Sequence, residues 1–402
     1  MSEQIPVLNL KEQYQQFQSQ LEEAVLNVLR SGRYILGDNG VRLEGQIAAL
    51  SGCRHGIGVA NGTDALNLAL WALDIEAGDE VITTPFTFAA TVEAIAFRRA
   101  KPVFVDIDPV TYNIDASLIE KAITPRTKAI MPVHLFGLPA DMDTILALAD
   151  KYSLKVIEDN AQAIGATYRN RPTGSLSHLA CISFYPTKNL GACGDAGMVV
   201  TNDDALAERL RVLRAHGMRK RYYHDELGVN SRLDEVQAVI LLSKLPYLAK
   251  WNARRREVAE LYDKALVGCP NIVPPKVSFS DREHVWHQYT IRVKDGAAQS
   301  SNGSASRHAR EIVMDKLAKQ GVGSMCYYPV PLHTQTAFKE YGYRQGDFPI
   351  AEAVASQVLS LPMYPELTEA QVNQVAITLK EVVQDGAGFA PHKLTPSPSL
   401  AN

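Results

Sequence analysis

The sequence has few cysteines and no long apolar run, and both shortages narrow what the protein can be. Its five cysteines are scattered over 402 residues, without a Cys-x-x-Cys pair. This spacing disfavours structural zinc and a disulfide framework, and it favours a reduced, cytoplasmic setting. No apolar run approaches the roughly 20 residues that cross a bilayer. The N-terminus, MSEQIPVLNLKEQYQQ, lacks the basic and apolar regions of a signal peptide. We therefore expect a cytoplasmic protein without a membrane partner.

The chain also lacks an excess of either charge, which excludes another class of function. Its 41 Lys and Arg residues stand against 44 Asp and Glu residues, a formal net charge of -3. The global positive field of a nucleic-acid binder is therefore absent, and any anionic ligand must be held by local groups. With 46% hydrophobic residues, the chain can bury a large core, and its length suggests two or three domains.

Short apolar segments alternate with amphipathic ones from residue 55 to about residue 200. The short segments are often β-branched and bounded by turn residues, as strands are, and the longer ones have helical periodicity. This alternation predicts an α/β fold with a mainly parallel sheet covered on both faces. Such sheets bind ligands beyond the carboxyl ends of their strands. The expected strands are 55–60, 80–84, 101–106, 128–136, 154–159 and 181–185, and the expected helices are 63–73, 89–99, 115–123 and 141–152.

The pattern changes along the chain, and we divide it accordingly. Residues 1–250 form the expected large domain, N-terminal helices included, and residues 251–385 a smaller C-terminal α+β domain. The smaller domain contains an expected strand at 287–293 and an expected helix at 306–321. A Gly/Ser-rich segment, 295–306, is typical of a mobile loop inside this domain. The tail, 386–402, has the composition of a disordered segment.

The first expected strand ends at Asn61-Gly62-Thr63-Asp64, where a helix begins. Free backbone amides, a small glycine and a hydroxyl at a helix N-terminus can hold a phosphate group. The alternative is an ordinary helix cap made by Thr63 or Asp64. The glycines of GIGVANG do not match the spacing of the dinucleotide fingerprint, which argues against a nicotinamide oxidoreductase.

Three other strand ends carry polar or aromatic groups. Asp159 follows an apolar strand, with Gln162 three residues later, and a buried carboxylate needs a positive partner unless it only caps a helix. Ser183 lies within a strand, and Lys188 follows that strand. A lysine in a dry pocket has a lowered pKa and can attack a carbonyl, although most lysines extend to the surface. Phe88 follows another strand and can stack on a flat ring or belong to the core.

Together these groups are the parts of a pyridoxal phosphate site. A helix N-terminus can hold the phosphate, and an aromatic side chain can stack on the ring. A carboxylate keeps the ring nitrogen protonated so that the ring can accept electrons, and a lysine forms the Schiff base. An unrelated sheet protein would rarely present all four at its strand ends. The sequence therefore predicts pyridoxal 5'-phosphate as the cofactor and no metal.

Five motifs, in the order NGTDALNLAL, TPFTFAATVEAI, VIEDNAQAIGA, SFYPTKNLGACGDAG and GVNSRLDEVQAVIL, resemble those of the DegT/StrS group of sugar aminotransferases. The resemblance covers roughly residues 5–376 and includes YYPVPLHTQ near the end. It implies a fold type I pyridoxal-phosphate enzyme. Lys188 then matches the lysine that forms the Schiff base and moves protons, and Asp159 matches the partner of the ring nitrogen.

The resemblance also implies how the remaining cofactor contacts are made. Gln162 would lie near the phenolic oxygen of the ring, and Phe88 would stack on its face. The phosphate would be held by Gly62, Thr63 and Ser183. These roles rest on the positions at which this sequence matches the motifs of the family.

A homodimer and a two-step reaction follow from the same resemblance. Asn230, in GVNSRLDE, is similar to a phosphate ligand that the family takes from the neighbouring subunit. An amino acid, usually L-glutamate, would give its amine to the cofactor, and a keto group on a nucleotide-linked sugar would accept it. Lys188 would carry out the proton transfer in each half of the reaction. The stretch SFYPTKNLG is more similar to enzymes that aminate C3 of the sugar than to those that aminate C4.

Several residues are candidates for substrate contact. A basic, aromatic loop at 219–224 can hold a diphosphate or be an ordinary solvated loop. The segment YYPVPLH is similar to family positions near the sugar pocket, and a packing role is the alternative there. His134 is expected to be structural. The candidate substrate residues are Arg219, Arg221, Tyr222, Tyr223, Tyr328 and His333.

Two further functions are compatible with the same scaffold. A pyridoxal-phosphate-dependent sugar dehydratase of this family would carry histidine in place of Lys188, so Lys188 argues against it. A non-catalytic regulatory or binding protein would have no need of an imine-forming lysine. The full set of cofactor residues therefore favours the aminotransferase.

Overall fold

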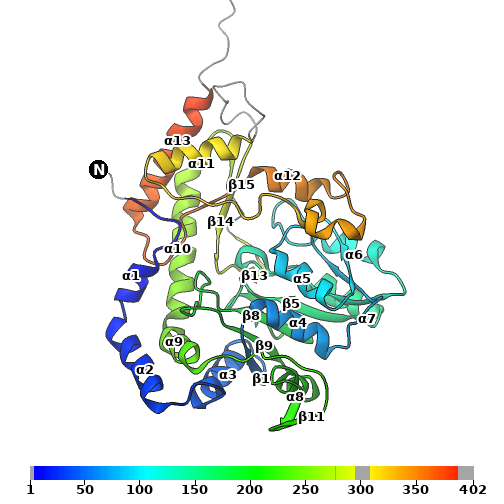
Figure 1. Cartoon of the computed structure of the whole chain (residues 1–402). Coiled ribbons are helices and arrows are strands. Elements are labelled where there is room, and N and C mark those ends of the chain that lie inside the picture. The colour runs from blue at the N-terminus through cyan, green and yellow to red at the C-terminus, as the bar shows by residue number, and fades with distance from the viewer. Residues whose placement is uncertain (1–3, 277, 295–307, 388–402) are drawn as a thin grey trace, which may run out of the picture.

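The computed structural model describes residues 4–276, 278–294 and 308–387, and its centre is a seven-stranded sheet (Figure 1). β9 is antiparallel to both of its neighbours, whereas every other neighbouring pair is parallel. The mainly parallel sheet expected from the sequence is thus confirmed, with one reversed strand inside it. In order across the sheet, the strands are β1 (His55–Val59), β9 (Gly197–Thr201), β8 (Leu179–Ser183), β5 (Lys155–Asp159), β4 (Thr127–Ile130), β2 (Glu80–Thr83) and β3 (Lys101–Phe104).

Helices cover both faces of this sheet, because successive side chains of a strand point to opposite faces. In β8, Leu179 and Cys181 join the core on one face, while Ala180 and Ile182 join the core on the other. One face is covered by α4 (Gly62–Ala72), α5 (Ala89–Phe97) and α8 (Asp204–Leu213). The opposite face is covered by α3 (Asp38–Leu50), α6 (Ala116–Ala122), α7 (Met142–Lys151) and α9 (Glu235–Lys244).

Every strand and helix expected between residues 55 and 185 forms, with some changes at the ends. The expected strand 128–136 ends early, at Ile130, because Pro132 has no N–H to continue the ladder. The first helix after β1 is capped by Asn61, whose side-chain oxygen accepts a hydrogen bond of 2.8 Å from the N–H of Asp64. Asn61, rather than Thr63 or Asp64, is therefore the capping residue, which leaves the Thr63 hydroxyl for other contacts.

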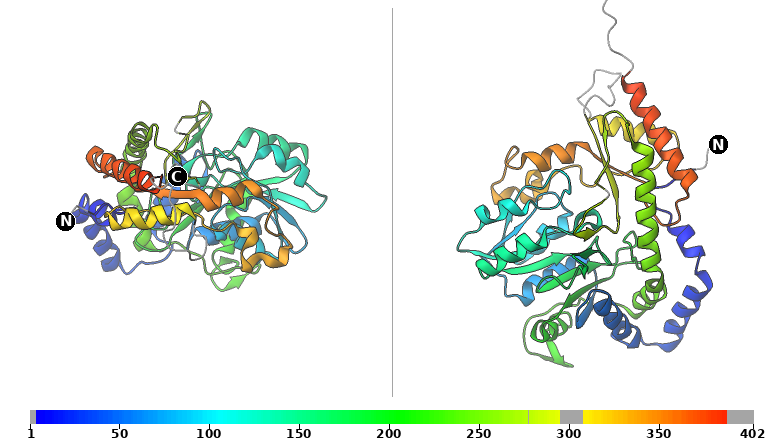
Figure 2. Two further views of the ribbon diagram at one scale, coloured as in Figure 1. Left: turned by 90° about the horizontal axis from the view of Figure 1, so that it is seen from above. Right: turned by 180° about the vertical axis from the view of Figure 1, so that it is seen from behind.

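Two helices near the N-terminus, α1 (Leu10–Gln15) and α2 (Gln18–Ser31), lie along the outside of the molecule beside α9 and α10 (Leu248–Leu266) (Figure 2). Phe17 and Leu21 form a small core there with Ile240 and Trp251. The rings of Phe17 and Tyr247 stack with centroids 5.8 Å apart. The N-terminal helices expected in the large domain therefore pack against its last helices.

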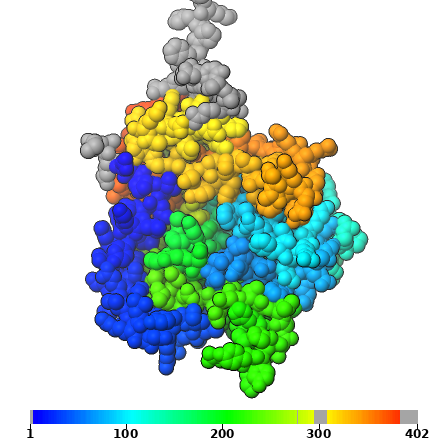
Figure 3. Space-filling model, viewed as in Figure 1, coloured from blue at the N-terminus to red at the C-terminus, as the bar shows by residue number. Residues whose placement is uncertain are grey.

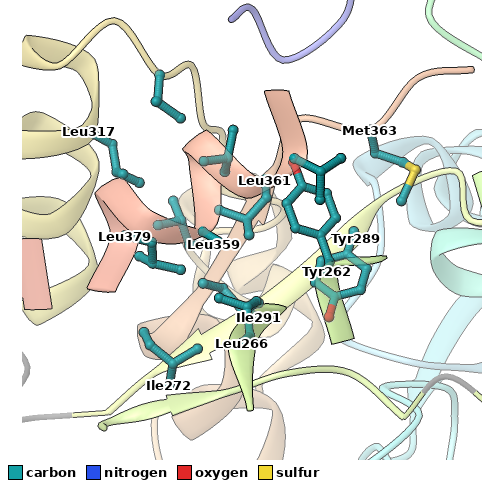
Figure 4. Close-up of a cluster of buried hydrophobic side chains, with 14 of the residues drawn as sticks. Tyr262, Leu266, Ile272, Tyr289, Ile291, Leu317, Leu359, Leu361, Met363 and Leu379 are labelled. Atoms are coloured by element: carbon teal, nitrogen blue, oxygen red, sulfur yellow. The ribbon is translucent and has the colours of Figure 1, made fainter. Parts of the chain in front are cut away.

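A second core lies around an antiparallel sheet of β12 (Ile272–Val273), β14 (Tyr289–Val293) and β15 (Val358–Leu361) (Figure 4). Ile5 also belongs to this core, and it pairs with Val322. The domain boundary at residue 250 stays a prediction, since one helix spans it. The helices of this core are α10 (Leu248–Leu266), α11 (Ala309–Lys319) and α13 (Glu369–Ala387).

Smaller elements complete the described chain. A hairpin of β10 (Met218–Lys220) and β11 (Tyr223–His224) projects from the body of the molecule (Figure 3). No helix among the described residues is both long and apolar enough to cross a membrane. The expected loop 295–306 lies outside the described residues, as does 388–402 of the expected tail, whereas residues 386 and 387 of that tail belong to a helix that ends at Ala387. The remaining elements are β6 (Thr167–Tyr168), β7 (Arg171–Pro172), β13 (Arg282–Glu283), α12 (Pro349–Gln357) and short 3₁₀ turns at Leu135–Gly137, Leu245–Tyr247, Leu332–Thr334 and Thr336–Tyr341.

Candidate active site

A cavity of about 750 Å³ lies at the carboxyl ends of the parallel strands. Its wall comes from the segments that follow β1, β2, β5 and β8, and from a part of the chain near the second core. This is the edge at which the sequence predicted the site. Of the predicted residues, the cavity brings together Gly62, Thr63, Phe88, Asp159, Gln162, Ser183, Lys188 and Tyr328.

One end of the cavity is suited to an anion. The backbone amides in the first turn of α4 have no partners within the helix, and the helix dipole favours negative charge there. The Ser183 hydroxyl oxygen accepts a hydrogen bond of 3.3 Å from the N–H of Tyr185, so its own hydrogen can be donated to a ligand. An added Cβ at Gly62 would lie 2.7 Å from the Ser183 Cβ. Only glycine therefore lets these two segments approach so closely.

Lys188 follows β8 in a tight turn, in which its N–H donates to the Tyr185 carbonyl at 2.8 Å. Its side chain lines the cavity. Burial lowers the pKa of the Lys188 amine to about 8, and the charge of Asp159 partly opposes that shift. A neutral amine is a nucleophile and a proton acceptor, so Lys188 has the properties that the sequence predicted for it.

Asp159 ends β5, and both of its carboxylate oxygens accept a hydrogen bond. Oδ2 accepts from the Thr91 hydroxyl at 2.8 Å, and Oδ1 accepts from the N–H of Ala161 at 3.2 Å. Burial raises the pKa of Asp159, while these two donors act in the opposite direction. Among the described residues, Asp159 forms no salt bridge. A cationic group on a ligand would stabilise its charged form.

A second hydroxyl supports this arrangement. The Thr87 and Thr91 side-chain oxygens lie 3.0 Å apart and are buried. Because Thr91 donates its hydrogen to Asp159, Thr87 must donate to Thr91. Neither threonine was among the site residues predicted from the sequence. Thr91 lies in the first turn of α5 and Thr87 lies four residues before it. This i, i+4 spacing could have indicated from the sequence that the two hydroxyls meet.

Gln162 and Tyr328 are joined on another wall of the cavity. The Gln162 Oε1 accepts from the N–H of Phe136 at 2.6 Å, so its Nε2 donates to the Tyr328 hydroxyl at 3.0 Å. Burial raises the pKa of Tyr328, which keeps its hydroxyl protonated and able to donate. Phe88 is 57% exposed and its ring lies 6.2 Å from that of Tyr328, so a flat face is open to the cavity.

Other predicted residues lie outside this cavity. His333 is buried, with Nε2 2.9 Å from a Glu352 oxygen, and its ring packs on Phe348. His134 is also buried. Its Nδ1 accepts from the N–H of Ala140 at 3.1 Å, so its Nε2 donates to Glu158 at 2.9 Å. These contacts agree with the structural role expected for His134 and favour the packing alternative for His333.

The basic loop forms the projecting hairpin, which does not line the cavity of its own chain. Arg219 lies 3.6 Å from Glu208 and 3.4 Å from Asp225, and the Arg221 guanidinium lies 5.0 Å from the centre of the Tyr222 ring. Tyr222 is 75% exposed. Tyr223 and Asn230 are exposed as well, and Asn230 pairs with Ala215. Their substrate and cofactor roles remain predictions.

The residues of the cavity fit pyridoxal phosphate. A helix N-terminus and a hydroxyl can hold its phosphate, and a buried carboxylate without a salt bridge can hold the protonated ring nitrogen. An exposed aromatic face can stack on the ring. The Lys188 amine, whose pKa is lowered, lies in the same cavity and can form the Schiff base. The cavity therefore has a group for each part of the cofactor.

Comparison with known proteins gives the same result. Residues 15–380 match the profile of the DegT/DnrJ/EryC1/StrS aminotransferase family. A Geobacillus stearothermophilus protein named "Pleiotropic regulatory protein" is 50% identical over 380 residues, covering 94% of this chain and 98% of that protein. The "UDP-N-acetyl-3-dehydro-alpha-D-glucosamine 3-aminotranferase" of Acidithiobacillus ferrooxidans is 46% identical over 379 residues, covering 94% of this chain and 98% of that protein. A crystal structure of DesV from S. venezuelae with a ketimine intermediate superposes with a TM-score of 0.90 and 42% identity, over 95% of this chain and 99% of that one.

Proposed function

Because the chain belongs to the DegT/DnrJ/EryC1/StrS aminotransferase family, we propose that it aminates the keto group at C3 of a nucleotide-linked sugar. It is a pyridoxal-phosphate-dependent aminotransferase, as the family and its solved members are. We propose L-glutamate as the amine donor and the cytoplasm as its location. The choice of C3 is supported by the name of the A. ferrooxidans relative. The observation that carries the proposal is that Lys188 and Asp159 share one cavity with a helix N-terminus.

The cofactor, when bound, supplies an electron-accepting ring that stabilises negative charge on the carbon next to the amine. The residues of this chain hold that ring and exclude water from it. The amides of Gly62 and Thr63, with the Ser183 hydroxyl, would hold the phosphate. Phe88 would cover one face of the ring. Asp159, held by its two donors, would keep the ring nitrogen protonated.

Lys188 is the proton carrier in this scheme. An amine with a pKa of about 8 is partly neutral near physiological pH, so it can accept a proton from the substrate carbon. The protonated side chain would then hold that proton inside the cavity and be able to return it. The order is reversed in the second half of the reaction. A dehydratase of this family would carry histidine at this position, so Lys188 favours the aminotransferase.

We further propose that two copies of the chain form a homodimer with shared active sites. The segment from Tyr34 to Leu36 exposes 45% to 47% of each of three apolar side chains. It lies beside the segment that contains Asn230, since Ile35 pairs with Asp234 and the Tyr34 carbonyl accepts from the N–H of Glu235. An apolar surface of this kind is typical of an interface, and it would bring Asn230 to the phosphate of the partner's cofactor.

A spectroscopic experiment tests the proposed function. The purified protein with pyridoxal phosphate should absorb visible light, and L-glutamate should bleach that band. A panel of UDP- and dTDP-linked 3-keto and 4-keto sugars is then added to the bleached enzyme. We expect the 3-keto sugars to restore the colour.

Each failure has a different meaning. A protein that gains no visible band contradicts the cofactor assignment. A coloured protein that no amino acid bleaches is a regulatory or binding protein, as the name of the G. stearothermophilus relative suggests for that protein. Restoration by 4-keto sugars alone contradicts amination at C3.

A further inference from the structure

His287 lies in the wall of the cavity and has no part in the scheme above. It immediately precedes Gln288 and β14, so it reaches the site from the second core rather than from the large sheet. Its side chain is 6% exposed, and its N–H donates to the Phe136 carbonyl at 2.9 Å. The ring is therefore held firmly at the edge of the site, and its protonation can be worked out from its neighbours.

Two buried amides fix the hydrogen bonds behind this ring. The Asn252 Nδ2 donates to the Ile164 carbonyl at 3.1 Å, so the Asn252 Oδ1 is left to accept from Asn189 at 2.9 Å. The Asn189 Nδ2 also donates to the Val285 carbonyl at 2.9 Å. A carbonyl oxygen can only accept, so neither amide can be reversed without losing these bonds.

The orientation of Asn189 determines the tautomer of His287. The Asn189 Oδ1 lies 3.2 Å from the His287 Nδ1, and an amide oxygen is only an acceptor. The Nδ1 must therefore carry the hydrogen, and the Nε2 of a neutral ring has a lone pair. Burial lowers the pKa of His287 well below its usual value, and the charge of Lys188 acts in the same direction. The ring is thus neutral in the working range of pH.

The lone pair is available for a ligand. Among the described residues, none forms a hydrogen bond with the Nε2 of His287. Asn189 lies behind the wall and does not line the cavity, so the Nδ1 edge of the ring faces away from it. The Nε2 edge is left toward the space shared with Lys188. A hydrogen bond from a ligand would stabilise this buried acceptor, whereas leaving a buried acceptor unpaired costs free energy.

The two substrates of the proposed reaction differ in how they can use this acceptor. An ionised carboxylate of an amino acid has no hydrogen to donate, so its oxygens are repelled by the lone pair. A sugar hydroxyl has a hydrogen to donate. We propose that His287 is a specificity-determining residue whose Nε2 accepts a hydrogen bond from a hydroxyl of the sugar substrate. This proposal rests on the proposed function.

The two half-reactions test it separately. His287→Phe keeps a flat ring and removes both nitrogens, whereas His287→Gln returns an amide oxygen that can accept. For His287→Phe we expect bleaching by L-glutamate to stay within about threefold of wild type. The KM for the keto sugar should rise about 10- to 100-fold, the cost of an unpaired buried hydroxyl. His287→Gln should recover part of that loss. Thermal melting and the cofactor dissociation constant confirm that each variant is folded and loaded.

Equal losses in both half-reactions, or no loss in either, would overturn the proposal. Nitrogen-15 NMR of histidine-labelled holoenzyme gives a second readout, with His287 assigned by its absence from His287→Phe. We expect one protonated and one unprotonated ring nitrogen, unchanged between about pH 6 and 8. A cationic ring, or a hydrogen on Nε2, would overturn the assignment of the acceptor. If no keto sugar restores colour in the wild type, the proposed function itself fails, and the NMR result still reports the tautomer.

Discussion

Lys188 and Asp159 affect each other's charge in the cavity. Burial lowers the pKa of the lysine, and the aspartate opposes that shift. In the cofactor-free protein we expect Lys188 to react with an acylating reagent with a midpoint of about pH 8. Asp159→Asn removes the opposing charge, so the midpoint should move to lower pH. The rate of modification against pH, followed by peptide mass spectrometry, measures both midpoints, and Lys188→Ala is the blank. A wild-type midpoint near the usual lysine value of about 10 would contradict a buried amine.

Thr91 offers a second test at this scale. Thr91→Val keeps the shape of the side chain and removes the hydrogen that stabilises the Asp159 carboxylate. The pKa of Asp159 should rise, so the acidic limb of the kcat/KM profile should move to higher pH. We expect kcat to fall about 10- to 100-fold, as for the loss of a hydrogen bond to a charged group. Thr91→Ser keeps the donor and should retain most of the activity. A pH profile that is the same in Thr91→Val and wild type would contradict this role.

The cavity residues differ in how well the sequence reveals them. Gly62, Asp159 and Lys188 follow predicted strands, so their meeting at one sheet edge follows from the alternation of strand and helix. Thr91 is one helical turn beyond Thr87 and was within reach of the same reasoning. His287 could not be predicted in this way, because it reaches the cavity from the second core. Where that core meets the sheet depends on tertiary packing, which no local pattern encodes.

At the scale of elements, the close approach of the N-terminus of α4 to β8 can be tested through Gly62. Gly62→Ala would place a Cβ 2.7 Å from the Ser183 Cβ, so the two segments must separate. We expect the dissociation constant of pyridoxal phosphate to rise at least about 10-fold, with a lower melting temperature. Absorbance titration and thermal melting measure these effects.

Gly45 is the matched control, since it also lies in a helix but an added Cβ there meets nothing within 4 Å. Gly45→Ala should leave cofactor binding unchanged and stabilise the protein by up to about 1 kcal/mol. If the Gly62→Ala variant still bound pyridoxal phosphate tightly, the phosphate would have to be held elsewhere.

Among the elements, β9 was the least predictable part of the sheet. Its sequence, GMVVT, is a short apolar run that fits a buried strand of either direction. Its antiparallel place between β1 and β8 is decided by pairing with residues far away in the sequence. By contrast, β5 follows α7, a helix of clear periodicity, so its parallel arrangement beside β4 was predictable.

At the scale of the whole molecule, the shared active site predicts complementation between two inactive variants. Lys188→Ala removes the amine, and Asn230→Asp sets a negative charge against the partner's phosphate, so each homodimer should be nearly inactive. In a mixed dimer, one site carries both changes and the other carries neither. With random pairing, half of the dimers are mixed and half of their sites are intact, so activity should return to roughly a quarter of wild type.

Subunit exchange must be shown independently, for example by mass spectrometry of differently tagged chains. Mixing either variant with more of itself is the control. Exchange without any return of activity would show that Lys188 and Asn230 do not meet across an interface.

The reversed strand inside the sheet also sets an order of events during synthesis. β1 is the first strand to leave the ribosome, yet its register pairs His55 with Thr201, in β9. Until β9 has emerged, β1 has no partner in the finished sheet and remains an apolar strand with open edges. The helix N-terminus that follows it is held against Ser183 only after that pairing. The nascent chain therefore gains its phosphate-binding end late, because a chain released before β9 lacks the strand that joins β1 to β8.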